Sequence, residues 1–223
     1  MKSRTLLWGC IKRRECLVPT WRGWLLLTLF ISALGVTAVL RVHSFLAITE
    51  PIPAEALVVE GWLPNYVLAE AKAEFERHHY AKLYVTGVAL ESDGELLYEN
   101  NTYADLGAAS LIRIGMSKDF IQTIPAPLVQ QDRTYTSAVA LKNWLQQHAA
   151  GETRLNVVSV GTHARRSRLL FQKAFGKDSL VGIIAVEDRD YNPNRWWEFS
   201  QGVRQVIDEL FAYIYAKIAF AFV

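Results

Sequence analysis

Short apolar strands alternate with amphipathic helices over most of the chain, and this alternation restricts the fold more than any other feature. The expected strands are residues 56–62, 82–87, 120–125, 155–161 and 181–188, and the expected helices are residues 64–79, 102–116, 134–149, 162–176 and 196–223. Apolar strands that lack polar alternation are typical of a parallel sheet covered on both faces. The sequence therefore predicts an α/β fold, a three-layer Rossmann-like and mostly parallel sheet with helices on both faces.

A long apolar segment precedes this alternation. Residues 24–40 contain no charged side chain, and Trp21 and Trp24 lie where interfacial aromatic residues are common. If Arg41 snorkels, the apolar stretch continues to Ile48. The sequence predicts one N-terminal transmembrane anchor over residues 23–48. A cleavable signal peptide is the nearer alternative, and a buried helix is the more remote one.

The charge of the chain is unevenly distributed. Residues 1–22 carry six basic side chains and one acid, so of a formal net charge of +2 this leader holds +5 and the rest of the chain −3. Both cysteines, Cys10 and Cys16, also lie in the leader. The positive-inside rule places residues 1–22 in the cytoplasm and the main domain on the other side of the membrane. A mildly acidic domain argues against nucleic-acid binding.

Two further segments complete the expected organisation. Residues 49–55 form a short proline-marked linker, and residues 56–223 form the domain, which closes with a long helix. We expect one face of this helix to pack on the sheet, namely Val203, Val206, Ile207, Leu210, Phe211, Ile214 and Ile218. The tail beyond Tyr213 is too short to span a bilayer, and we expect it to pack on the domain or the anchor, or to rest in the membrane interface.

A cationic cluster follows the fourth expected strand. Gly161 provides a turn, and His163, Arg165, Arg166 and Arg168 follow at the start of a helix. Helical spacing places Arg166 beside His163, and it places Arg165 and Arg168 on the solvated side. Together with the free N–H groups of a helix N-terminus, these side chains predict an anion site for phosphate or carboxylate. The alternative is a solvated basic helix start in which His163 caps the helix or fills space.

Polar residues also follow other strands. Ligands of open parallel sheets bind outside the carboxyl ends of the strands, so the candidate ligand-binding residues beside Arg166 are Glu60, Gly61, Thr86, Gly87, Asp132, Arg133 and Thr134. The last three begin a helix whose hydroxyl and N–H groups would complement an anion held by His163 and Arg166. Either Asp132 or Thr134 would cap that helix, and Asp132 would alternatively orient the imidazole or hold Arg133.

The sequence contains few other signals of chemistry. Asp188 and Asp190 follow the last strand and would accept a metal or a sugar hydroxyl, although loop solvation explains them equally well. The G-x-G-x-x-G, Walker, H-E-x-x-H and G-x-S-x-G patterns do not occur. We therefore predict neither a cofactor nor a metal site.

The order of these motifs resembles the ElyC/SanA/YdcF family of bacterial envelope proteins. The corresponding stretches are VVEGW, VTGV, TYTSA and SVGTHARR, within residues 54–215. The most specific of them is H-x-x-R after a strand, which His163 and Arg166 match in this sequence. The chain departs from the family pattern at Val88, where relatives have a second glycine, and at Thr136–Ser137, where they have a Glu–Asn pair.

The resemblance carries several functional expectations. It implies a single-pass protein of the bacterial inner membrane whose main domain is periplasmic. It also implies that the protein binds or processes an anionic, phosphorylated precursor, free or lipid-linked, in cell-envelope and peptidoglycan biogenesis. One branch of the family is reported to bind S-adenosylmethionine.

The sequence leaves three functions open and does not decide whether the protein is an enzyme. In the first, His163 is catalytic as acid, base or phosphate donor, Arg166 and Arg133 clamp charge, and Thr134 contacts the ligand. An imidazole near its ordinary pKa would suit proton transfer at neutral pH. In the second, the same residues bind a small molecule without turnover. In the third, the C-terminal helix makes the chain a protein-interaction module at the membrane.

Overall fold

The computed structural model of the chain describes residues 5–6, 11–12, 19–90, 102–148, 154–176 and 179–221. It divides the chain into two units, Met1–Leu40 and Arg41–Val223. Most of the basic leader expected at residues 1–22, with Cys10 and Cys16, lies outside the described residues.

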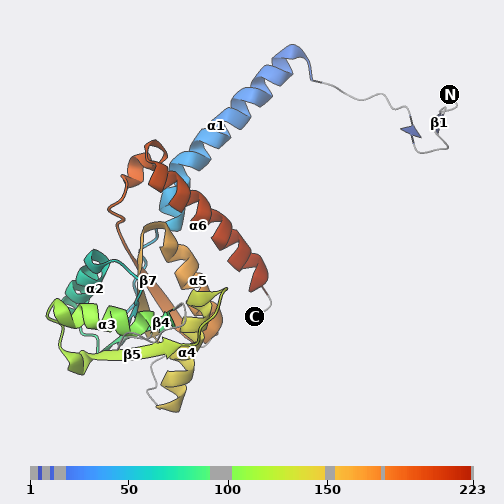
Figure 1. The fold of residues 1–223 in the computed structure, drawn as a ribbon. Helices are drawn as coiled ribbons and strands as arrows, with labels where there is room; N and C mark the ends of the chain where they lie inside the picture. Colours follow the sequence, from blue (N-terminus) through green and yellow to red (C-terminus); the bar gives the residue numbers. More distant parts are fainter. Residues whose placement is uncertain are drawn as a thin grey trace. The chain divides into compact units, whose positions relative to one another are not determined.

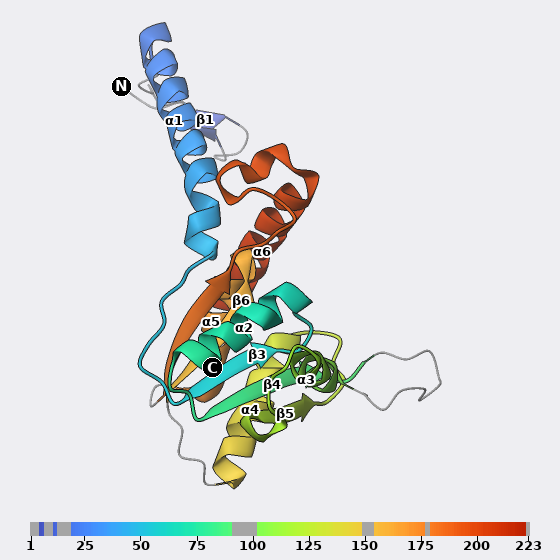
Figure 2. The same ribbon diagram turned by 90° about the vertical axis from the view of Figure 1, so that its left-hand side faces the viewer.

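A five-stranded, all-parallel sheet forms the centre of the second unit, which confirms the predicted α/β fold. Its strands are β3 (Ala56–Glu60), β4 (Lys82–Val88), β5 (Ile121–Ala126), β6 (Arg154–Val160) and β7 (Leu180–Val186). They lie in the order β5-β4-β3-β6-β7 (Figure 2). The chain adds strands outward from β3 to β5 and then returns to place β6 on the other side of β3. The strand order therefore reverses between β3 and β6, which is where open parallel sheets bind ligands.

Helices cover both faces of this sheet (Figure 1). They are α2 (Asn65–Arg77) and α3 (Tyr103–Arg113) on one face, and α4 (Arg133–Gln147) and α5 (Ala164–Phe175) on the other. Alternate residues of β3 point to opposite faces, so Val59 packs with Val67 of α2 and Val58 with Leu141 of α4 and Phe171 of α5. This double coverage explains why the strands are continuously apolar in the sequence.

The long helix expected at residues 196–223 is broken in the structure. A 3-10 helix, η3 (Pro193–Glu198), contains a kink at Arg195, and Phe199 is extended. Only then does α6 (Ser200–Ala219) begin, and it packs on α5 (Figure 1). Pro193 at the start of η3 and the Asn192 side chain, which accepts a hydrogen bond from Asn194 N–H, favour a separate short element.

The face of α6 that packs on the domain matches the expected face only in part: Val206 is buried, and Val203 and Leu210 pack in the same cluster as Leu46. Gly202, Val206, Ala216 and Phe220 are the buried residues of this segment. Four of the side chains expected to pack on the sheet are exposed instead, namely Ile207, Phe211, Ile214 and Ile218. The helix carries two apolar seams, and helical spacing alone does not tell which of them meets the domain.

The described part of the first unit contains a two-stranded pairing and most of a long helix. β1 (Thr5–Leu6) and β2 (Ile11–Lys12) pair antiparallel. The helix α1 (Trp21–Leu46) is long and apolar enough to span a membrane, and its most apolar window is entirely exposed. Its Thr28 and Thr37 hydroxyls donate to carbonyl oxygens one turn earlier, which satisfies them within the helix. A signal sequence near the N-terminus would form a helix with the same length and composition.

The last turn of α1 and the expected linker belong to the folded domain. Leu46 is fully buried in a cluster with Trp196 and Val206. Glu50 forms an antiparallel bridge with Ile183 of β7. The domain therefore begins before residue 49, where we expected a linker, because the edge strand β7 still has backbone groups to pair.

Candidate functional site

Most of the predicted site residues meet at the carboxyl edge of the sheet, beside the reversal of strand order. A cavity of about 510 Å³ lies there. The predicted residues that line it are Glu60, Thr86, Gly87, Asp132, Arg133, Thr134, His163 and Arg166. Gly61 does not line it.

Gly61 and Gly87 allow a close approach of backbones. A Cβ atom on Gly61 would lie 2.0 Å from the carbonyl oxygen of Tyr103, and one on Gly87 would lie 2.4 Å from the nitrogen of Ala104. Any larger residue would therefore push the start of α3 away from the ends of β3 and β4. For Gly61 this packing requirement explains the glycine, and no ligand contact is needed to do so.

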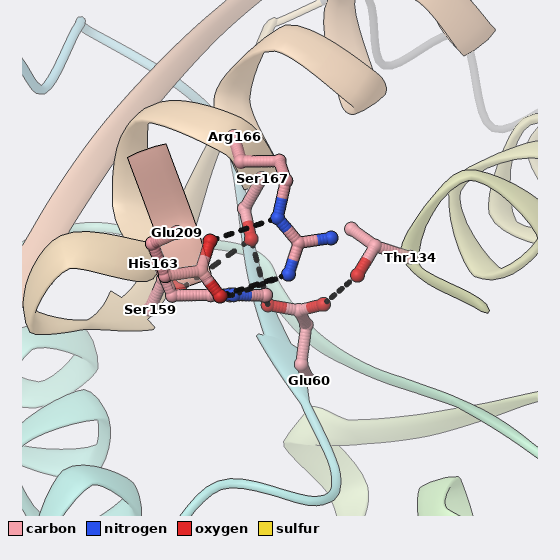
Figure 3. A network of polar contacts seen from close by, with 7 residues as sticks. All are labelled: Glu60, Thr134, Ser159, His163, Arg166, Ser167 and Glu209. Atoms are coloured by element: carbon pink, nitrogen blue, oxygen red, sulfur yellow. Dashed lines mark hydrogen bonds and ion pairs between the residues drawn. The ribbon is translucent and has the colours of Figure 1, made fainter. Parts of the chain in front are cut away.

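Glu60, the last residue of β3, is a buried carboxylate that lines the cavity, and Figure 3 shows its polar contacts. Its Oε1 accepts a hydrogen bond of 3.0 Å from Thr134 Oγ1, and its Oε2 accepts one of 3.0 Å from Ser167 Oγ. His163 Nε2 lies 3.5 Å from Oε2. These contacts join the end of β3 to the starts of α4 and α5.

A second carboxylate, Glu209 of α6, holds the other side of the imidazole (Figure 3). His163 Nδ1 lies 2.9 Å from Glu209 Oε1. Arg166 donates to both oxygens of Glu209, from Nε at 2.8 Å and from Nη2 at 3.0 Å. His163 and Arg166 thus lie side by side, as their spacing in the sequence indicates, and they share one carboxylate.

The two carboxylates beside His163 favour the cationic form of its imidazole. Burial alone lowers the pKa of its imidazole, but the carboxylates of Glu60 and Glu209 outweigh burial and raise that pKa to about 9. Burial raises the pKa of each carboxyl, yet the charge of His163 and the hydrogen bonds hold the pKa of Glu60 and of Glu209 below the ordinary value. The expectation of an imidazole near its ordinary pKa is therefore wrong, because the sequence did not show the two acids beside it.

The site keeps hydrogen-bonding groups that no described residue satisfies. His163 Nε2 and Thr86 Oγ1 are buried and have no hydrogen-bond partner in the described part of the chain. The 3.5 Å separation from Glu60 gives Nε2 an ion-pair contact without a hydrogen bond. Arg166 Nη1 is drawn without a contact in Figure 3 and has none among the described residues. Buried polar groups are normally paired, so His163 Nε2 and Thr86 Oγ1 indicate room for a ligand.

The start of α4 adds backbone donors. Asp132 takes the N-cap position with φ of 54°, and its side chain makes no capping hydrogen bond. The first N–H groups of the helix therefore lack the side-chain acceptor that we expected from Asp132. Asp132 does not orient the imidazole either, because Glu60 and Glu209 already flank both ring nitrogens.

Two of the arginines that we placed on the solvated side instead hold the N-terminal part of the domain. The Arg165 guanidinium lies 4.1 Å from the centroid of the Phe45 ring and donates to the Phe45 carbonyl oxygen. Arg168 donates to Val181 O at 3.1 Å and forms an ion pair with Glu50. From the cationic cluster after β6, only His163 and Arg166 line the cavity.

Aromatic side chains form much of the remaining wall. Trp62, Tyr103 and Tyr215 line the cavity. The Trp62 ring meets the His163 ring edge-on, with centroids 5.0 Å apart. Such a wall shields the imidazole from water and offers flat apolar surface to a ligand.

The two acids after β7 lie apart from this cavity. Asp188 Oδ1 accepts a hydrogen bond of 2.9 Å from Asp190 N–H, which is a local loop contact. Within the described residues, no group of three or more His, Cys, Asp or Glu side chains is arranged to hold a metal ion.

Neither the protein-family models nor the curated proteins give a match to this chain. The functional inference therefore rests on the site: an imidazole between two carboxylates, with buried polar atoms that have no hydrogen bond to any described residue, beside the strand-order reversal.

Proposed function

We propose that the domain binds an anionic small molecule in the cavity at the ends of β3 and β4, beside the starts of α4 and α5. The observation that carries the proposal is the pair of buried atoms, His163 Nε2 and Thr86 Oγ1, that have no hydrogen-bond partner in the described part of the chain. Leaving a buried polar group unpaired costs about 1–3 kcal/mol. A ligand that accepts hydrogen bonds there removes this cost.

The other groups around the cavity favour a phosphate or a carboxylate. Arg166 Nη1, the N–H groups at the start of α4 and the side chain of Arg133 are all donors. The acids Glu60, Glu209 and Asp132 balance the formal charges of the three cations that line the cavity. The ligand therefore gains affinity from directed hydrogen bonds more than from net charge.

The wider role is part of the same proposal. Following the family resemblance, the ligand is a phosphorylated precursor of the bacterial cell envelope, free or lipid-linked, in peptidoglycan biogenesis. The domain faces the periplasm, and α1 holds it in the inner membrane with the basic leader in the cytoplasm. Burial of Leu46 supports an anchor that is not removed, since cleavage after Ala47 would take Leu46 out of the core.

The site also limits the chemistry in which His163 can take part. A charged imidazole is a proton donor rather than a base at neutral pH, and its Nε2 is the atom left for the ligand. If the protein is an enzyme, His163 acts as the acid, and His163→Gln abolishes turnover. If it only binds, His163→Gln lowers affinity and there is no turnover to lose.

The test is thermal unfolding of the full chain in lipid nanodiscs with inorganic phosphate, a polyprenyl phosphate, a nucleotide sugar and S-adenosylmethionine. A ligand at 100 times its dissociation constant adds about 2.7 kcal/mol of stability. We expect Thr86→Val and Arg133→Ala to reduce the shift, and Arg113→Ala, which removes an exposed charge outside the cavity, to keep it. Absence of a shift with every compound, or an equal shift in all variants, contradicts the proposal.

A further inference from the structure

We infer that the outer face of α6 lies on the surface of the lipid bilayer. This face, here called the α6 seam, consists of Ile207 (42% exposed), Phe211 (66%), Ile214 (44%), Tyr215 (53%) and Ile218 (71%). The inference concerns a second membrane contact besides α1 and does not depend on the ligand proposed for the cavity.

The α6 seam is unusual for the outermost helix of a domain. Its members recur every three or four residues, so they share one side of the helix over about 16 Å. The opposite side meets the domain through Val206, Ala216 and Phe220. A helix in this position normally presents charged and polar groups to water. Contiguous large apolar side chains there indicate a surface that something covers.

The path of the chain identifies the bilayer as that cover. The Phe45 ring, in the last turn of α1, lies 5.7 Å from the Tyr213 ring of α6, edge to face. Leu46 packs in one cluster with Val206. The α1 residues before this turn form an apolar helix with a fully exposed 18-residue window. If that window crosses the membrane, the turn that contacts α6 emerges at the lipid headgroups, and α6 is held beside them.

The residues around the α6 seam are those that membrane interfaces favour. Trp197 and Phe199, just before α6, are 38% and 40% exposed. Arg204 and Lys217 are exposed on α6 itself. Amphipathic aromatic rings and long basic side chains settle at the headgroup level, where their apolar parts reach the acyl chains.

The experiment measures the surroundings of single spin labels on the full chain reconstituted in vesicles of phosphatidylethanolamine and phosphatidylglycerol. Cys10→Ser and Cys16→Ser remove the native thiols, and labels are placed at Phe211→Cys and Ile218→Cys. Phe120→Cys is the matched control, because Phe120 is an aromatic residue of 46% exposure just before β5. All three positions are exposed, and the Phe120 ring also contacts the ring of Phe75, with centroids 5.4 Å apart.

We expect labels at positions 211 and 218 to collide more often with oxygen, which concentrates in lipid, than with a water-soluble nickel complex. The label at position 120 should show the reverse preference. Preference for the nickel complex at positions 211 and 218 overturns the inference, because the seam is then in water. Protection of both labels from both reagents also overturns it, because a second copy or another part of the chain then covers the seam. No ligand is present, so the result is independent of the test of the cavity.

Discussion

At the scale of single residues, the site depends on a charged histidine held between two carboxylates. Glu60 and Glu209 favour the charged form of His163, and the charge of His163 in turn favours the charged form of each carboxylate. Removing one partner from a buried ionic cluster leaves a charge without compensation, which costs about 3–5 kcal/mol. The cluster therefore fixes the position of α6 against α5 as well as the state of the imidazole.

Glu209→Gln tests this dependence. The amide cannot balance His163 and Arg166, so we expect unfolding free energy to fall by about 3 kcal/mol and the pKa of His163 to decrease. Chemical denaturation and titration by NMR measure the two effects. Asp208→Asn is the matched control, because Asp208 is the neighbouring acid and is exposed. Equal losses in the two variants would show that Glu209 has no special role.

The raised pKa of His163 also predicts how stability depends on pH. A group whose pKa rises on folding, here from 6.5 to about 9, stabilises the folded state fully below the lower value. We expect unfolding free energy to decrease between about pH 6.5 and 9, by on the order of 3 kcal/mol. Denaturant unfolding across this range measures it. The decrease should disappear in His163→Gln and persist in His148→Gln, whose imidazole is exposed; persistence in both would refute the assignment.

Substitutions at Thr86 and Thr134 are expected to change the stability of the protein in opposite directions. Thr86→Val removes a buried hydroxyl without a partner in the described chain, so we expect the free protein to gain about 1 kcal/mol. Thr134→Val removes a donor to the Glu60 carboxylate, so we expect a loss of about 2 kcal/mol. Thermal unfolding without ligand compares the two. A loss in Thr86→Val as large as that in Thr134→Val would mean that the Thr86 hydroxyl is already satisfied.

The sequence predicts only the local part of this site. His163 and Arg166 are three residues apart on one helix, so their proximity follows from helical geometry. Glu209 is 46 residues from His163 and arrives through the packing of α6. In the sequence, Glu209 is an acid on the same side of the helix as Val206 and Ala216. It could be predicted as a site residue only if this side were already known to face the domain.

At the scale of elements, the strands were predictable and the orientation of the last helix was not. Each strand is continuously apolar because both faces of the sheet are covered, and few other structures give that pattern. In α6, the seam through Ile207 and Phe211 is more apolar than the one through Val206 and Ala216. Burial favours the more apolar side of α6 only when water is the alternative, so the bilayer contact that we infer for the outer side would explain why the prediction was wrong.

Val206→Ala and Ile207→Ala test which side of α6 packs on the domain, because these adjacent residues lie on different sides of the helix. Val206 is 1% exposed, so its truncation should cost about 2 kcal/mol. Ile207 is 42% exposed, so we expect a change of no more than about 0.5 kcal/mol in detergent. Unfolding of both variants in the same detergent gives the comparison. A larger loss for Ile207→Ala would mean that the outer seam packs on the domain.

At the scale of the whole molecule, the site follows from the topology. Because β6 returns to the far side of β3, the helices after these strands diverge to opposite faces and leave room at the carboxyl edge. The alternation of strands and helices in the sequence was enough to predict that a site would lie at this edge of the sheet. It did not indicate that residues 41–52 are part of the domain, because their contacts with α6, β6 and β7 are long-range and leave no periodic pattern.

The central claim is that His163 is charged and keeps Nε2 for an anion. Nitrogen NMR of the full chain in nanodiscs, with labelled histidine and His163→Gln for assignment, tests it at about pH 7.5. We predict that both ring nitrogens of His163 carry protons, and that a polyprenyl phosphate shifts the Nε2 resonance but leaves Nδ1, which bonds to Glu209, nearly unchanged. A neutral imidazole at this pH, or an Nε2 resonance that responds neither to this lipid nor to inorganic phosphate, would contradict the claim.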